Sequence, residues 1–338
     1  MEYPKFKVCC RCFAFNQAKY ITDAMNGFTM QQTSFPFVCT IVDDASTDGE
    51  QDVIRKYVED NFDFSEGSVS YHKESDYAHI TYAQHKTNKN CYFAVLYLKE
   101  NHYSQRKPKM GYLSEWRDMC EYEALCEGDD YWIVPDKLEK QVSFLDNNIE
   151  YSCCYHNCYY KKQNQLNAKN LPSTDEDTPI DTIIYSWAHI PTNSLLYRKC
   201  LINEEYKSFS SSCSVGDGPL EIFLAHKGRV RYFSIIMSVY RVNSQGSWSE
   251  TIAKDKSKAL AHYNNCIEWL RFADIFTQYE YTDAIKKSIE RYKFFIIHLN
   301  LTRDFFRMIK IKEYRDYFNG FSLMNRIKFI INYLLGRI

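Results

Sequence analysis

The apolar and polar positions of the first 60 residues follow two periods. Residues 5–13 carry an apolar side chain at every second position, which predicts a strand, and residues 17–28 carry apolar side chains at helical spacing. Residues 37–42 form a continuous apolar run, as expected of a strand covered on both faces, and a second helical pattern runs through residues 53–58. This order of strand, helix, strand and helix predicts an open α/β sheet.

A further apolar segment precedes two adjacent aspartates. Residues 122–126 predict a buried strand, and Gly128 then turns the backbone before Asp129 and Asp130. Residues 137–147 have one apolar stripe and predict a helix. Adjacent acids on an extended segment point in opposite directions, so one can face a divalent ion and the other a neighbouring ligand group. A solvated turn is the alternative, since such dipeptides are frequent in loops.

The stretches between and after these elements are less regular. Two short segments, 69–71 and 80–82, fit strands, whereas residues 88–108 are polar and turn-like. Residues 151–160 predict another strand, and residues 161–178 predict a polar loop. From residue 256 onward the apolar positions recur at helical spacing.

Composition excludes several classes of protein. The 338 residues include 42 basic and 43 acidic side chains, so no general attraction to nucleic acid is expected. Hydrophobic residues make up 45% and aromatic residues 16%, which excludes a disordered chain. Thirteen cysteines without paired spacing, and no apolar signal segment, predict a reducing cytoplasm. No run approaches the roughly 20 apolar residues that a membrane span needs.

Asp43 and Asp44 end the second predicted strand, and hydroxyl side chains and a turn glycine follow them. Polar residues at the end of a strand in this order predict a nucleotide-binding loop. A helix cap plus a turn is the alternative and would by itself account for Ser46 and Thr47. The chain lacks a glycine-rich dinucleotide fingerprint and a phosphate loop of the Gly-Lys-Ser/Thr type. Phosphate would then be held by other means, such as a metal ion at Asp130.

Asp217 lies at the entrance of another predicted helix, for which Pro219 suits the first turn and Lys227 the last. Glycines on both sides of Asp217 allow a ligand to approach closely. Spacing alone favours an N-cap for this residue. A helix N-terminus would also lower its pKa and keep it ionised at neutral pH.

Four segments in the right order resemble family 2 glycosyltransferases, which are nucleotide-sugar-dependent enzymes of GT-A fold. The segments are residues 8–21, 37–57, 126–145 and 216–249, of which the third begins with the letters CEGDDYW. The resemblance implies an α/β fold with a GT-A type, Rossmann-like nucleotide-sugar-binding sheet. It covers the chain to about residue 250 and so places the glycosyltransferase domain at 1–250. The helical spacing of the rest predicts a C-terminal helical region at 251–338.

The family's pattern assigns roles to residues of the first half. By position, Phe13, Phe15 and Asp44 contact the nucleotide base, Asp129 faces the donor ribose or sugar, and Asp130 binds Mn²⁺ or Mg²⁺. The family usually has Pro or Thr where Phe13 stands and Tyr where Phe15 stands, so stacking on the base is kept and a hydroxyl contact is lost. The family often places a basic residue at the pyrophosphate, and three candidates remain open: Lys86, Lys89 and Arg106.

The pattern of the second half implies that Asp217 is the catalytic base. Gly216 stands where the family often has Glu, and Glu221 is a weaker substitute one turn further on. Arg241 lies in a segment that the family places near the diphosphate. It can pair with a phosphate or with a carboxylate, and the sequence leaves both open.

The implied reaction is transfer of a sugar from a nucleotide-diphosphate donor, with a UDP-linked donor expected, to a hydroxyl of a glycan or lipid-linked glycan. For inversion, a base takes the acceptor proton while a metal stabilises the leaving diphosphate. Two alternatives remain: a sugar nucleotidyltransferase, which would release pyrophosphate, and a noncatalytic glycan-binding protein on the same fold.

The C-terminal residues 321–337 combine apolar side chains with basic neighbours. Such a segment can lie on a membrane surface that carries a lipid-linked acceptor, which would give a peripheral contact at the inner face of the membrane. Packing against the preceding helices is the favoured alternative.

Overall fold

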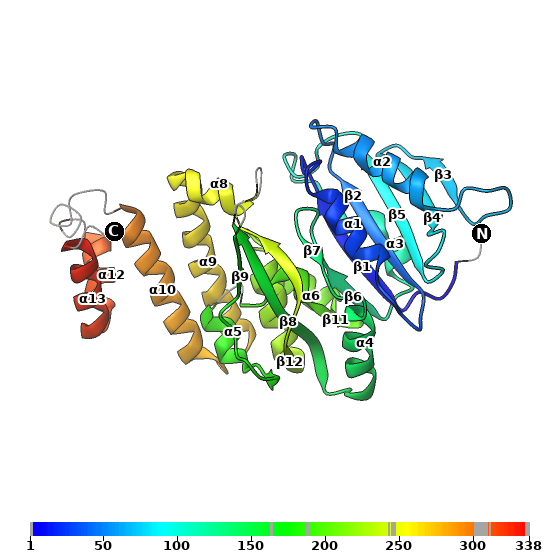
Figure 1. Ribbon diagram of the computed structural model, residues 1–338. Helices are drawn as coiled ribbons and strands as arrows, with labels where there is room; N and C mark the ends of the chain where they lie inside the picture. Colours follow the sequence, from blue (N-terminus) through cyan, green and yellow to red (C-terminus); the bar gives the residue numbers. More distant parts are fainter. Residues whose placement is uncertain are drawn as a thin grey trace. The chain divides into compact units, whose positions relative to one another are not determined.

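Figure 1 shows the computed structural model of the chain, in which residues 3–162, 165–186, 189–242, 244, 248–300, 310 and 312–334 are described. The chain divides into two compact units. The first comprises Met1–Pro179, Ile190–Glu204 and Leu224–Ser249, and the second comprises Ile180–His189, Glu205–Phe223 and Glu250–Ile338. The helical second unit therefore includes two segments that precede residue 250.

A mixed sheet organises the first unit, in the strand order β10-β12-β8-β11-β6-β1-β2-β5-β4-β3. Its centre is parallel: β1 (Val8–Ala14) lies between β2 (Phe37–Asp43) and β6 (Tyr122–Leu125), and β5 (Cys91–Leu98) follows β2. The outer strands are β3 (Tyr71–Glu74), β4 (Ala78–Gln84), β8 (Tyr151–Lys162), β10 (Glu176–Asp177), β11 (Leu196–Arg198) and β12 (Arg229–Arg241). Off this path, β7 (Tyr131–Trp132) pairs with β12, and β9 (Gln165–Ala168) pairs with β8. The prediction of an α/β sheet is confirmed.

Helices cover both faces of the central strands. The α-helices of the first unit are α1 (Ile21–Thr29), α2 (Glu50–Asn61), α3 (Ser114–Arg117) and α4 (Lys137–Asn147), and the short 3₁₀ helices are η1 (Met110–Leu113), η2 (Thr192–Ser194) and η3 (Lys199–Leu201). Val8 and Cys10 of β1 belong to a core cluster with α1, α2 and α4, whereas Cys9 belongs to a second cluster with Trp116 of α3. Successive side chains of β1 thus point into two different hydrophobic cores, one on each face of the sheet.

The predicted helix over residues 137–147 is confirmed with the same bounds as α4. The prediction of a turn-like stretch over 88–108 is wrong in part: residues 91–98 form the fully buried strand β5, whereas residues 89–90 and 102–106 are turns. Its polar flanks have structural partners: the side-chain amide of Asn88 donates to the carbonyls of Thr29 and Gln31. The predicted loop over 161–178 is also wrong in part, since it contains the end of β8 together with β9 and β10.

The second unit is helical, which confirms the predicted C-terminal helical region. Its helices are α5 (Ile180–Ser186), α6 (Glu204–Ser210), α8 (Trp248–Lys254), α9 (Lys256–Phe276), α10 (Thr282–Asn300), α12 (Lys312–Gly320) and α13 (Leu323–Leu334), and α7 (Asp217–Lys227) begins in it. Apolar residues at helical spacing in α9 and α10 are buried, among them Ile267, Leu270, Ile285 and Ile296. Within the described part of the chain, no helix has the length and apolarity to cross a membrane.

Candidate functional site

Two pairs of adjacent aspartates lie on either side of the end of β1: Asp43 and Asp44 at the end of β2, and Asp129 and Asp130 after β6. In the register of the sheet, Ala14 at the end of β1 is paired with Asp43 at the end of β2. The N–H of Asp44 donates to the carbonyl of Ala14 at 3.0 Å, and the N–H of Gly128 donates to the carbonyl of Phe13 at 3.1 Å. The carboxyl ends of parallel strands meet at one edge of an open sheet, which is where such sheets bind ligands.

Gly128 allows the loop after β6 to lie directly on the loop after β1. A Cβ at this position would lie 2.5 Å from Oε1 of Gln17 and 2.8 Å from the Cβ of Ala14. Both distances are shorter than real Cβ contacts, so any side chain would push the loop away. No residue with a side chain fits at this position, so it must be glycine.

Asp129 and Asp130 are both buried, with 8% and 3% of their surface exposed. The backbone N–H of Arg241 donates to Oδ1 of Asp130 at 2.7 Å, and the hydroxyl of Ser244 donates to Oδ2 of Asp129. Burial raises the pKa of Asp129, and it raises the pKa of Asp130 well above its usual range, with the neighbouring Asp129 charge as a further cause. The pair is therefore costly to ionise unless a cation compensates it.

Arg241 connects this acidic pair to α1. Its guanidinium donates to the carbonyl of Asp129 and forms an ion pair with Asp23. The same guanidinium lies 4.8 Å from the ring centre of Tyr20 and 4.6 Å from that of Tyr131. The structure places Arg241 against the carboxylate of Asp23, and its pairing with a donor phosphate stays a prediction.

Asp44 is almost fully buried and organises the loop after β5. Its carboxylate accepts hydrogen bonds from the backbone N–H groups of His102 and Tyr103 at 2.7 and 3.0 Å, and from Nζ of Lys109 at 2.7 Å. Lys109 Nζ also lies 5.0 Å from the ring centre of Phe13. Lys109 is thus a basic residue at this edge of the sheet that the sequence did not single out, because it follows directly after the stretch interpreted as a loop.

Among the basic candidates from the sequence, Lys86 is engaged at the end of α2, where its Nζ donates to the carbonyls of Glu59 and Asp60 at 3.1 and 2.8 Å. Arg106 takes a positive φ of 55° in the loop that Asp44 holds. Lys109, by contrast, binds one of the acidic pairs directly, through Asp44.

The two predicted base-stacking residues differ in exposure. Phe13 is half-buried between Lys109 and the guanidinium of Arg11, which lies 5.2 Å from its ring centre. Phe15 has 39% of its surface exposed. Phe13 belongs to β1 and Phe15 to the loop after it, so both lie at the same edge of the sheet as Asp44.

The helix-cap alternative for Ser46 is wrong. α2 begins after Gly49, whose φ of 91° lies in the left-handed region that favours glycine. Ser46 instead joins the loops after β1 and β2: its Oγ accepts from the N–H of Asn16 at 2.9 Å and donates to Oε2 of Glu50 at 2.7 Å. The two loops therefore form one polar assembly at the end of the sheet.

Glu50 is a further buried acid at this edge that the sequence did not single out. Its Oε2 also accepts from the N–H of Gln17 at 3.0 Å. Burial raises the pKa of Glu50 to about 7, and the charges of Asp43 and Asp48 act in the same direction. Among the described residues, Oδ2 of Asp43 and Oε1 of Glu50 are buried without a hydrogen-bond partner. The ends of β1 and β2 thus concentrate desolvated carboxyl groups.

Asp217 lies in the second unit, as the first residue of α7. Its Oδ1 accepts from the N–H of Gly218 at 2.8 Å. The predicted lowering of its pKa is wrong in direction, because burial raises the pKa and outweighs the opposing backbone hydrogen bonds from Gly218 and from its own N–H. The role of Asp217 as a base stays a prediction.

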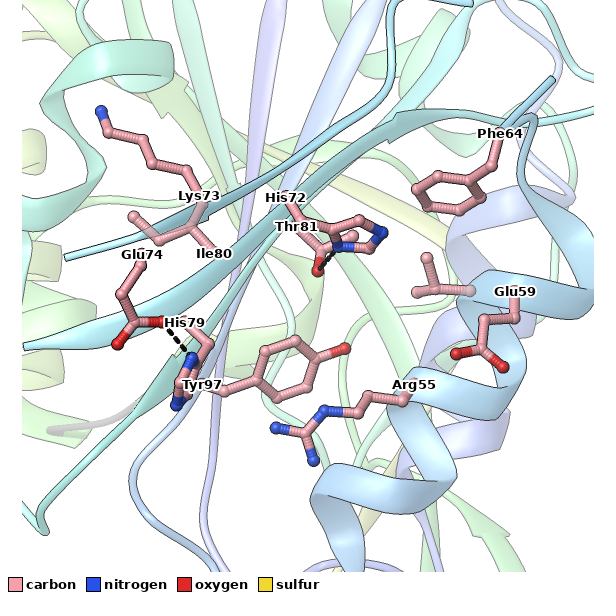
Figure 2. A pocket seen from close by; sticks show the side chains of 11 residues that line it. Arg55, Glu59, Phe64, His72, Lys73, Glu74, His79, Ile80, Thr81 and Tyr97 are labelled. Atoms are coloured by element: carbon pink, nitrogen blue, oxygen red, sulfur yellow. Dashed lines mark hydrogen bonds and ion pairs between the residues drawn. The ribbon is translucent and has the colours of Figure 1, made fainter. Parts of the chain in front are cut away.

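A separate pocket of about 450 Å³ lies between α2 and the hairpin of β3 and β4 (Figure 2). Some of its polar side chains are engaged with one another: Glu74 pairs with His79, and Nδ1 of His72 lies 3.0 Å from the hydroxyl of Thr81. None of the residues that line it belongs to the two acidic pairs. The candidate site is therefore distinct from this pocket.

Comparisons with sequences give relatives without an assigned function. No protein-family model matches the chain. Uncharacterised proteins from Mycobacterium tuberculosis and Mycobacterium bovis are 28% identical to it over 242 residues, which is 70% of this chain and 58% of those proteins. The chain therefore spans less than two thirds of the length of these curated relatives.

Comparisons with solved structures identify the fold. Residues 1–349 of TarS from S. aureus, in complex with UDP-GlcNAc, match with 15% identity and a TM-score of 0.53, over 93% of this chain and 79% of that one. The mannosyltransferase PcManGT from Pyrobaculum calidifontis, in complex with GDP-Man and Mn²⁺, matches with 13% identity and a TM-score of 0.53, over 100% of this chain and 82% of that one. The α/β sheet of this chain thus has the fold of proteins solved with nucleotide sugars.

Proposed function

We propose that this protein is a family 2 glycosyltransferase of GT-A fold, which transfers a sugar from a UDP-linked donor to a hydroxyl of a glycan or lipid-linked glycan with inversion. The observation that carries the proposal is the buried Asp129–Asp130 pair at the edge of the sheet where β1 and β2 end. The fold shared with structures that hold UDP-GlcNAc or GDP-Man supports it.

A divalent ion, Mn²⁺ or Mg²⁺, fits the chemistry of this pair. Carboxylate oxygens are preferred ligands of both ions, and a cation would compensate two carboxylates whose pKa burial raises. Among the residues that the structure describes, no group of three or more His, Cys, Asp or Glu side chains could hold a metal. The protein would then supply one or two ligands, with Asp130 as the first, and the donor's diphosphate and water would supply the rest.

The other residues of this edge take supporting roles in the proposal. Phe13 and Phe15 offer aromatic faces for the nucleotide base, and Asp44 acts with Lys109, whose ammonium group it holds beside Phe13. Asp129 faces the donor ribose or sugar. Arg241 is a positioning residue, because its guanidinium donates to the backbone carbonyl of Asp129.

Asp217 is the proposed general base. A carboxylate at the start of a helix, next to glycines, can be approached by an acceptor hydroxyl. Because burial raises its pKa, it would be a stronger base than an ordinary aspartate when ionised.

The test is a panel of nucleotide sugars measured for protection of the full chain against thermal unfolding, each with Mn²⁺ and with a chelator. A UDP-sugar should raise the melting temperature, and the chelator should remove most of the shift. Product analysis with the stabilising donor then separates the alternatives: a nucleoside diphosphate as the released product supports glycosyl transfer, whereas pyrophosphate identifies a nucleotidyltransferase. No stabilisation by any nucleotide sugar would overturn the proposal.

A further inference from the structure

The segment that leads to the proposed base lies along one face of α9. Asp217 is the first residue of α7, and only Val215 and Gly216 separate it from Ser214. This segment and α9 both belong to the second unit. The contacts between them therefore fix the backbone just before Asp217.

The side chain of Asn265 in α9 binds this segment at two points. Its Nδ2 donates to the carbonyl of Ser212 at 2.9 Å, and its Oδ1 accepts from the N–H of Ser214 at 2.6 Å. A primary amide carries a donor and an acceptor in one group, so a single asparagine can bind two backbone groups of an irregular segment. Removal of this amide would leave both backbone groups without the partners that they have here.

Two further contacts hold the ends of the segment. The indole N–H of Trp269 donates to the carbonyl of Phe209 at 2.9 Å, and Oγ of Ser214 lies 3.0 Å from Nδ1 of His262. Burial lowers the pKa of His262 to about 4, so its ring is uncharged at neutral pH and Nδ1 can accept from the hydroxyl. Positions 262, 265 and 269 are three and four apart, so they lie along one face of the helix.

The segment is polar and has little packing of its own to define its conformation. Four of its residues are exposed: Ser211, Ser212, Ser214 and Gly216. An exposed run of small residues loses conformational entropy when it is ordered, and buried apolar contacts are not there to offset that loss. The hydrogen bonds to α9 are therefore the contacts that order this segment.

We propose that Asn265 is a positioning residue for the general base: it holds the segment before α7 so that the carboxylate of Asp217 reaches the acceptor hydroxyl. This inference rests on the proposed function. A base acts only within hydrogen-bond reach of the proton that it takes, and a misplacement of about 1 Å can lower a rate by about 10²-fold. The C-terminal helical region then contributes to catalysis through α9.

Steady-state kinetics of Asn265→Ala measure the effect on turnover. We expect kcat to fall by about 10- to 100-fold while the KM for the donor changes by less than about twofold, because the Asp129–Asp130 pair lies in the other unit. Asn265→Asp should recover part of the rate, since it keeps the acceptor for the N–H of Ser214 and loses only the donor. Asn264→Ala is the matched control, because Asn264 is the same residue type on the same helix and is exposed.

A double variant separates positioning of the base from a general loss of structure. If Asn265 acts through Asp217, then Asn265→Ala should lower the kcat of the Asp217→Asn variant by less than about twofold, because the base is already absent. A structural defect elsewhere would lower kcat by the same factor in both backgrounds. Equal factors would overturn the proposal, and so would a natural kcat in Asn265→Ala alone.

Hydrogen exchange of the full chain tests the contact without any sugar transfer. The backbone N–H of Ser214 should exchange at least about tenfold faster in Asn265→Ala than in Asn264→Ala or the natural protein, because its acceptor has been removed. Unchanged exchange would overturn the proposal. If exchange becomes faster but the natural protein transfers no sugar, the contact stands, the proposed function fails, and the catalytic role of Asn265 fails with it.

Discussion

The backbone N–H of Arg241 donates a 2.7 Å hydrogen bond to Oδ1 of Asp130, which lies 111 residues earlier in the chain. The last residue of β12 thereby fixes the carboxylate that follows β6, while its guanidinium holds the carbonyl of Asp129. The position of the acidic pair is therefore determined by a distant strand as well as by its own loop.

Arg241→Gln should keep the backbone bond to Asp130 and remove the contacts with Asp23 and the two tyrosine rings. We expect a loss of about 1–2 kcal/mol in the free energy of unfolding, since Arg241 is buried while Asp23 is half exposed, together with weaker donor binding. Urea unfolding measures the free energy of unfolding, and calorimetry measures donor binding. Asp23→Asn is the control, and we expect it to cost less because the rings still hold Arg241. Equal costs for the two variants would contradict this role of the guanidinium.

Asp130→Asn should separate folding from metal-dependent binding. At neutral pH the change removes a desolvated acid whose pKa burial raises, so the melting temperature should stay equal or rise. Binding of a nucleoside diphosphate with Mn²⁺ should weaken by at least about tenfold, a loss of about 1.4 kcal/mol, while a nucleoside without phosphates binds as before. Calorimetry with and without a chelator checks this. Unchanged affinity for the diphosphate would remove Asp130 from the metal site.

The local patterns of the chain were sufficient to predict most of the central sheet. β2 is a largely apolar run because both of its faces are covered, and α4 has a clear apolar stripe between Asp136 and Asn148. β6 is also buried throughout, although it contains Glu123, which pairs with Arg11 and Arg117. β5 was missed although it is equally buried, because its tyrosines and its asparagine and lysine neighbours suggested a polar loop. Asn88 is polar for a different reason, since it binds the carbonyls of the loop after α1.

The partners of the candidate site residues could not be predicted in the same way. The contact of Arg241 with Asp23 joins residues 218 apart, and that of Lys109 with Asp44 joins residues 65 apart. Such contacts depend on the order of strands in the sheet, which periodicity does not encode. Glu50 was hidden for a related reason: on a surface helix it would be an ordinary acid, and here its carboxylate binds Gln17 of the loop after β1 and Ser46 of the loop after β2.

Glu50→Gln should change how stability depends on pH. Because the folded protein raises the pKa of Glu50 to about 7, the native state binds a proton that the unfolded chain releases near pH 4.5. This contribution to stability is complete below about pH 4.5 and is lost as the pH rises to about 7. The Gln variant should therefore lose less stability than the natural protein between these pH values, measured by urea unfolding at each pH. Parallel stability curves for both proteins would contradict the raised pKa.

The last helix provides a test of membrane contact. Phe329 of α13 is buried, whereas Leu323, Met324, Ile327, Ile330 and Ile331 are partly or largely exposed. The buried face fits packing against other helices, and the exposed apolar face fits contact with a membrane surface. Each of the two roles considered from the sequence therefore describes one face of α13.

Replacing Met324, Ile327 and Ile331 together with serine should reduce sedimentation with anionic liposomes several-fold and leave the melting temperature nearly unchanged, since these side chains are exposed. A double change of exposed polar residues in α2 (Lys56→Ser and Glu59→Ser) is the control. Equal sedimentation of all proteins would exclude the membrane contact.

Asp217→Asn tests the proposed base. An acceptor hydroxyl is a weak nucleophile until its proton leaves, so loss of the base should lower turnover by about 10²- to 10⁴-fold. Asn can still accept the hydrogen bond from Gly218, and it avoids the cost of a buried charge, so the melting temperature and donor binding should be kept.

The pH profile gives an independent measure of the same residue. Because the pKa of Asp217 is raised, the acidic limb of kcat/KM should lie above the pKa of about 3.9 that an ordinary aspartate has, and activity should fall as the pH drops through it. The residual activity of the Asn variant should lack this limb. If the variant instead kept near-normal turnover and the same acidic limb, Asp217 would be a structural residue at the start of α7, and Glu221 would be the next candidate for the base.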